Sequence, residues 1–217
     1  MAVSLRGRTS SISATVSLPV TANTGDIILA ITTRVRGSSN NINTPAGYTS
    51  LFSDGVGSTK NSSVGMKAVY KIAAGGETSV SLTLPNTDTG RPSFVYVFSG
   101  ASIVTVQAAS TSSSNGPYSS SSWTTPSAGY VMTLFGIASS SGTPTVSGST
   151  TDYYLRDDWA LTLIGEWGDQ ISGASIGSVS GASNGNYNSA GVSVNMVIET
   201  LVPNYYTDLG SNSPVVY

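Results

Sequence analysis

The chain has 217 residues, of which only 9% are charged, and its 9 basic and 11 acidic residues give a net charge of -2; this balance excludes the basic footprint of a nucleic-acid-binding surface. It contains no cysteine and no histidine, which excludes disulfides, thiolate metal sites and every Ser-His or Cys-His catalytic arrangement. No apolar run approaches the length of a membrane span, and residues 1–9 lack the apolar region of a signal peptide. We therefore expect no membrane association, and we expect the chain to be made and folded in the cytoplasm.

The first half of the chain predicts short β-strands separated by turns. Residues 1–9 are expected to form a short arm, and residues 10–18 alternate apolar with polar side chains as a strand does. The clearest strand spans residues 25–36; one face is apolar, whereas the other begins apolar and ends at Arg34 and Arg36. We therefore expect this strand to leave the core and enter solvent at its second end. Further strands are predicted at residues 66–72, 80–84 and 94–98.

The second half repeats this order of elements. Residues 130–137 match the strand at 25–36, and later segments match the strands that follow it. The absence of sustained helical periodicity and the many turn signals predict an all-β, Greek-key or jelly-roll-like sandwich of two pseudo-repeated halves, with essentially no helix. Two abutting small sandwiches are the alternative. The predicted organisation is an N-terminal arm (1–9), a sandwich (10–199) made of a first half (10–109), a Ser-rich bridge (110–125) and a second half (126–199), and a C-terminal arm (200–217).

The C-terminal segment is apolar but has no clear strand or helix period. A solvated tail rarely ends on β-prone apolar residues. We expect an arm that packs on its own domain or adds a strand to a neighbouring subunit. Its candidate contact residues are Tyr205, Tyr206, Val215, Val216 and Tyr217.

Five short motifs combine turn residues with strand segments. They are Thr24-Gly25-Asp26, Thr44-Pro45-Ala46-Gly47-Tyr48, residues 68–73 (AVYKIA), Glu77 and residues 94–101 (FVYVFSGA). This series resembles a β-sandwich module that recurs in tailed-phage virion proteins and in some large bacterial surface proteins, with Tyr48 where that pattern usually has Trp. The resemblance covers about residues 10–198. It implies a non-enzymatic virion or surface-display role, with no catalytic residues to transfer.

Acidic residues gather in the second half of the chain, at Asp152, Asp157, Asp158, Glu166 and Asp169. Two carboxylates could act in glycoside hydrolysis, with Asp158 and Glu166 as the candidate pair, or several carboxylate oxygens could bind Ca²⁺. The loop spacing of an EF-hand is missing, however, and Asp favours turns because its side chain bonds nearby backbone groups. We therefore favour the turn interpretation, with no catalytic residue, no metal and no cofactor.

Arginines and tyrosines are the candidate contacts for a partner. The basic candidates, which could meet an acidic capsid surface, are Arg6, Arg8, Arg34 and Arg36. The alternative is ordinary edge-strand charge that blocks unwanted pairing. Tyr118 and Tyr187 lie in Gly/Ser/Asn-rich stretches and are candidates for stacking on a glycan. Tyr153 and Tyr154 point to opposite faces if they lie on a strand, so at most one of them is buried.

These observations predict a non-enzymatic structural protein of a phage virion. It would decorate or cement a capsid or tail surface through contacts with capsid or tail proteins and with itself. A homo-oligomer is expected, with trimers favoured at lattice positions, and the expected location is the virion, assembled in the host cytoplasm. The alternative is a glycan-binding or receptor-binding module of a phage fibre or cell-surface protein, with a host surface glycan as partner.

Overall fold

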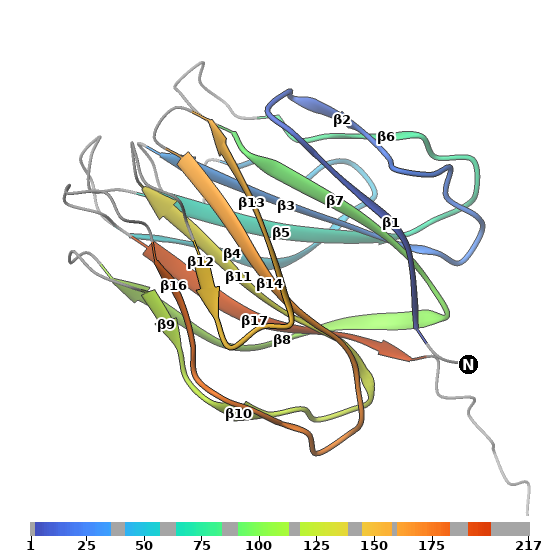
Figure 1. The fold of residues 1–217 in the computed structure, drawn as a ribbon. Coiled ribbons are helices and arrows are strands. Elements are labelled where there is room, and N and C mark those ends of the chain that lie inside the picture. The colour runs from blue at the N-terminus through green and yellow to red at the C-terminus, as the bar shows by residue number, and fades with distance from the viewer. Residues whose placement is uncertain are drawn as a thin grey trace, which may run out of the picture.

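A computed structural model shows a protein built from β-strands (Figure 1). The structure describes residues 3–35, 42–56, 64–83, 91–112, 118–138, 145–157, 160–182 and 191–200. Within those ranges the chain forms no helix, and hence none long and apolar enough to cross a membrane. The all-β prediction is confirmed.

Two antiparallel sheets of five strands form the body of the molecule. The first sheet has the order β1 (Ser4–Ser11), β7 (Ser93–Ser99), β3 (Ile27–Val35), β5 (Val64–Ile72) and β4 (Thr49–Val56). The second sheet has the order β13 (Thr151–Asp157), β14 (Ala160–Gln170), β11 (Gly129–Ala138), β17 (Gly191–Thr200) and β8 (Ala101–Ser112). The predicted strands at 66–72, 94–98 and 130–137 correspond to β5, β7 and β11.

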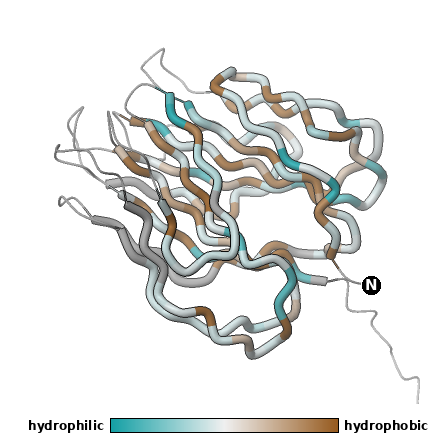
Figure 2. The backbone as a smooth tube through the Cα atoms, viewed as in Figure 1, coloured by the Kyte–Doolittle hydropathy of each residue, from teal (hydrophilic) through white to brown (hydrophobic). Residues whose placement is uncertain are grey.

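The inner faces of the two sheets share one hydrophobic core. In β3, Ile27, Leu29 and Ile31 face the second sheet, where they join Leu134 of β11 and Val194 of β17. Figure 2 shows apolar positions recurring along the strands of both sheets, as expected when alternate side chains point inward. The two halves therefore pack face to face as a sandwich.

Small β-ribbons cover the outer face of each sheet. On the first sheet, β2 (Thr15–Ser17) pairs with β6 (Ser79–Ser81), and Val16 and Val80 pack on Ile28 and Val95. On the second sheet, Trp123, Val146 and Ile176 pack on the face that carries Phe135. The ribbon strands there are β9 (Tyr118–Ser120), β10 (Trp123–Thr124), β12 (Thr145–Ser147), β15 (Ser175–Ile176) and β16 (Val179–Ala182). Both faces of the central strands β3 and β11 are thus buried.

The two halves have the same topology. β1, β7, β3, β5 and β4 of the first sheet correspond in order to β8, β17, β11, β14 and β13 of the second. Across the core the order is reversed, because Arg8 of β1 contacts Tyr153 of β13, while β4 contacts β8. This arrangement is that of two similar units related by a two-fold rotation. The predicted repeat is confirmed in the order of strands along the chain, and the structure shows that the order of strands within each sheet repeats too.

The ends of the described chain meet where one half passes into the other. Ser4 pairs with Ser99, and Thr200 pairs with Ala101, so both lie beside the corner at Gly100, which has a φ of 72°. Figure 1 shows the start of β1 near the end of β17. After β7 the chain therefore leaves the first sheet at this corner and continues as β8, an edge strand of the second sheet.

Three details differ from the sequence prediction. Residues 4–9, expected to be an arm, lie in β1, and the strand expected over 10–18 is interrupted by a bend at residues 12–14. Residues 101–109, expected in the first half, belong to β8 and pair with β17. Pairing partners far away in the sequence decide these boundaries. Residues 201–217, most of the predicted C-terminal arm, lie outside the described residues.

Candidate functional site

A buried carboxylate joins the two halves. Glu166 lies on the inner face of β14 and is only 4% exposed. The hydroxyl of Tyr96 donates to its Oε1 at 2.9 Å, and the hydroxyl of Tyr130 donates to its Oε2 at 2.6 Å. Arg8 Nη1 completes the group, 3.3 Å from Oε1 and 3.2 Å from Oε2. Tyr96 and Arg8 come from the first sheet, so the cluster bridges the core.

The surroundings of Glu166 keep its tyrosine partners neutral. Burial raises the pKa of Tyr96 well above its usual value, and the nearby Glu166 carboxylate raises it further. Burial and the hydrogen bond to Glu166 also raise the pKa of Tyr130. Both phenols therefore act as hydrogen-bond donors. The Arg8 guanidinium carbon lies 3.2 Å from the centroid of the Tyr153 ring, which adds a cation–π contact.

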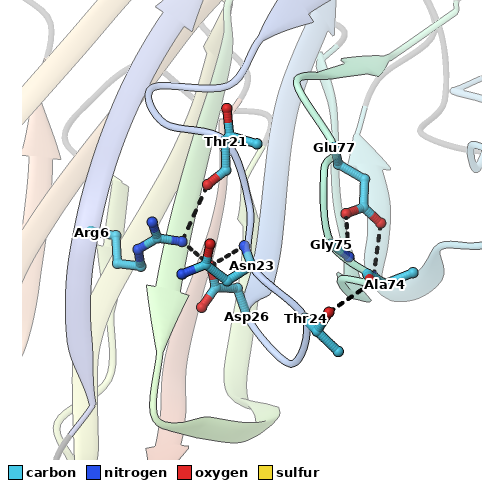
Figure 3. A network of polar contacts seen from close by, with 8 residues as sticks. All are labelled: Arg6, Thr21, Asn23, Thr24, Asp26, Ala74, Gly75 and Glu77. Atoms are coloured by element: carbon cyan, nitrogen blue, oxygen red, sulfur yellow. Dashed lines mark hydrogen bonds and ion pairs between the residues drawn. The ribbon is translucent and has the colours of Figure 1, made fainter.

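A second polar network fastens the turn that precedes β3 (Figure 3). Asp26 is buried, and its Oδ2 accepts the Asn23 N–H at 2.7 Å and pairs with Arg6 Nη1. Arg6 also donates to the carbonyl of Thr21 at 3.3 Å. The backbone of Asp26 accepts the Ala73 N–H at 2.8 Å. Asp26 thus holds its own turn and ties it to β1.

Glu77 fastens the turn after β5, as Figure 3 also shows. Its carboxylate accepts the N–H groups of Ala74 and Gly75, both at 2.9 Å, and Lys71 Nζ lies 2.8 Å from Oε1. The hydrogen bond with Lys71 and those from the backbone lower the pKa of Glu77 to about 2. Thr24 Oγ1 donates to the Ala74 carbonyl at 2.8 Å. The motif residues Thr24, Asp26 and Glu77 therefore stabilise the turns by bonding their backbone groups.

The arginines proposed as partner contacts are placed differently from one another. Arg34 is 1% exposed and lies on β3, the central strand, so the prediction that this end enters solvent is wrong. On the neighbouring strand β5, Lys67 stands opposite Thr32 and donates to the carbonyl of Ile42 at 2.8 Å. Arg6 and Arg8 lie on an edge strand, partly exposed, and pair with acidic residues of the same chain. Arg36 lies outside the described residues.

The acidic residues do not form a shared site within the part of the chain described. Asp157 Oδ2 accepts the backbone N–H of Arg91 at 2.8 Å, and Asp169 is exposed. No group of three or more potential metal ligands occurs among the described residues. Asp158 and the side chain of Asp152 lie outside them, so the proposed pair of Asp158 with Glu166 stays a prediction.

The two adjacent tyrosines of β13 point to opposite faces, as predicted. Tyr153 packs against the shared core beneath Arg8, whereas Tyr154 is 53% exposed. The side chain of Tyr118 and the whole of Tyr187 lie outside the described residues. The same holds for the C-terminal candidates Tyr205, Tyr206, Val215, Val216 and Tyr217.

No family model, curated protein or solved structure matches this chain. Its function must be argued from the placement of its own residues. The most distinctive cluster, Glu166 with Tyr96, Tyr130 and Arg8, was missed by the sequence analysis, although a signal existed. Glu166 falls two residues after Ile164 in an apolar strand, on the same face, which is where a buried charge with a partner is expected.

Proposed function

We propose that this protein is a non-enzymatic structural component of a phage virion, attached to a capsid or tail surface and to other copies of itself. The engagement of Glu166 by Arg8, Tyr96 and Tyr130 supports this most. Glu166 is the carboxylate that a hydrolytic mechanism would need, yet its oxygens already accept three internal donors. Asp26 and Glu77 are likewise engaged in turns. Only 9% of the residues are charged, and Ser, Thr, Asn and Gly fill most polar positions of the sequence.

The resemblance to phage virion modules adds support. A surface with few charges and many neutral hydrogen-bonding groups also suits a protein that binds a lattice. The test has two parts. Mass spectrometry of purified parent particles should find the chain in a fixed ratio to the capsid or tail subunit. Purified protein should leave host-surface polysaccharide intact. Absence from the particles, or turnover of polysaccharide that disappears in Glu166→Gln, would contradict the proposal.

Glycan binding through Tyr118 and Tyr187 is the second candidate, favoured by their position in polar stretches of the sequence. A glycan array provides the test. Saturable binding that is lost in both Tyr118→Ala and Tyr187→Ala would support this function, with Tyr48→Phe as the matched control because Tyr48 packs against the first-sheet ribbon. Binding that persists in both variants would rule out these two residues as its platform.

A further inference from the structure

The edges of the two sheets are not equivalent. Strands β1, β4, β8 and β13 form the four edges. Three of them carry extra residues opposite their neighbours: Arg6 in β1, Leu51 in β4, and Ser102 and Ala108 in β8. Such bulges twist an edge and discourage pairing with another chain. β13 pairs with β14 without any register shift, from Thr151 opposite Glu166 to Asp157 opposite Ala160.

β13 also presents an accessible outer side. Within the described residues it has a hydrogen-bonded strand neighbour on one side only. Its central residue, Tyr154, is 53% exposed, one of the few large hydrophobic side chains of the described chain left so open. The strand contains no proline and no glycine. A regular edge with a central exposed aromatic is suited to antiparallel pairing with another strand.

The sequence of β13, TDYYLRD, is complementary to itself in one antiparallel register. If two copies meet with Tyr154 opposite Tyr154, Asp152 of each copy stands opposite Arg156 of the other. Tyr153 then stands opposite Leu155. Opposite charges and aromatic or aliphatic pairs at directly facing positions each stabilise antiparallel strands. A two-fold axis repeats every pair, so the register contains two charge pairs and two apolar pairs.

Neighbouring registers lack this match. Centring the pairing on Tyr153 removes both charge pairs. Centring it between Tyr154 and Leu155 sets Asp152 opposite Asp157, which places like charges together. Charged residues on an edge strand generally prevent pairing with arbitrary partners. Here the same charges discriminate against other strands and other registers while permitting the self-matched one.

We propose that β13 pairs with β13 of a second copy across a two-fold axis, joining the two second sheets into one continuous sheet. This inference rests on the self-association included in the proposed function and names its surface. The particle and polysaccharide experiments above do not measure it, so either conclusion can fail alone. Pairing across a two-fold axis yields dimers, in contrast to the trimers expected from lattice positions.

The experiment is sedimentation velocity of the full chain from about 1 to about 100 µM, a range suited to a small interface. The wild type should show a dimer that dissociates on dilution. Asp152→Arg and Arg156→Glu should each be monomeric, since each places like charges opposite one another. An equimolar mixture of these two variants should form a heterodimer, because both cross-strand pairs then have opposite signs. Tyr154→Ala should weaken the wild-type dimer about tenfold.

The control is Asp169→Arg, which makes a similar charge reversal at an exposed position of β14, beyond Glu166, the last residue of β14 that pairs with β13. It should dimerise like the wild type. Circular dichroism of every variant checks that the fold is kept. A wild type that stays monomeric at the highest concentration, a trimer, or single variants that dimerise as well as the wild type would each overturn the inference.

Discussion

Arg8 Nη1 lies 3.3 Å and 3.2 Å from the two carboxylate oxygens of Glu166, although 158 positions separate these residues in the chain. Arg8 belongs to the first strand of the first sheet, and Glu166 to β14 of the second. Their contact, reinforced by Tyr96 and Tyr130, is a polar link across a mostly apolar core. Removing one member of a buried link of this kind is strongly destabilising, because the remaining charged or polar groups stay buried without their partner.

Replacing Glu166 with Gln should lower the free energy of unfolding by about 2 to 4 kcal/mol. The variant keeps the side-chain shape but removes the negative charge that Arg8 faces, and it replaces one of the two oxygens that accept tyrosine hydroxyls with an NH₂ donor. Urea unfolding followed by tryptophan fluorescence measures the loss. Asp169→Asn, an exposed change on the same strand, should cost less than about 0.5 kcal/mol. Equal losses in the two variants would contradict a role of Glu166 in joining the halves.

Glu77 should make stability depend on pH in the acidic range. Its pKa is lowered from 4.5 to about 2 by Lys71 and by the backbone N–H groups of Ala74 and Gly75. A lowered folded-state pKa means that its contribution is complete above the unfolded value and disappears as pH falls through the folded value. The stability difference between wild type and Glu77→Gln should therefore shrink between pH 4.5 and 2.

At neutral pH we expect this difference to be about 1 kcal/mol or less, because Glu77 is partly exposed and its ion pair is screened. Chemical unfolding of both proteins at several pH values measures it. A difference that stays constant down to the lower pH would show that Glu77 acts through its shape and not through its charge.

Two glycines of β11 should tolerate substitution unequally. A Cβ on Gly129 would collide with the backbone carbonyl of Ile198, which cannot move without breaking the sheet. A Cβ on Gly136 would lie 3.1 Å from Met66 Cβ and 3.2 Å from Thr33 Cγ2, side chains of the opposite sheet. We expect Gly129→Ala to cost more than about 3 kcal/mol and Gly136→Ala about 1 to 3 kcal/mol.

Thermal unfolding of the two glycine variants gives the comparison. The matched control is Gly177→Ala, because nothing lies within 4 Å of a Cβ at Gly177. This variant should unfold within about 1 kcal/mol of the wild type, with a small gain possible from reduced freedom of the unfolded chain. A Gly136 variant as stable as the Gly177 variant would show that the sheets can separate there at little cost.

A circular permutant should fold. Ser4 pairs with Ser99 and Thr200 pairs with Ala101, so the described ends and the corner at Gly100 lie together. Joining Thr200 to Ser4 through a flexible Gly/Ser linker and opening the chain at Gly100 keeps every strand pair. Circular dichroism and urea unfolding should show the native fold, with a loss below about 2 kcal/mol.

The control for the permutant is a chain opened within β11, which lies at the centre of the second sheet and should not fold. If the variant opened at Gly100 also failed to fold, the direct passage from β7 to β8 would be essential. If both variants folded, the position of the break would be unimportant.

Strand existence and the repeat could be predicted because alternation is a local property of the chain. The apolar face of residues 25–36 and its counterpart at 130–137 appear as β3 and β11, and the opposite orientations of Tyr153 and Tyr154 followed from the strand period alone. Glu166, considered above as a candidate catalytic carboxylate, could have been identified by the same argument as a charge on an inward face. Its partners could not, because Arg8 and Tyr96 belong to another sheet.

The sequence by itself therefore determined where most of the long strands lie, that their core-facing sides are apolar and that two similar halves exist. Only the tertiary structure decided what covers each face and which strands end the sheets. Arg34 is buried because β3 is central, and residues 101–109 belong to the second sheet because β8 pairs with β17. Both outcomes depend on contacts between residues distant in the chain, and local side-chain alternation does not report those contacts.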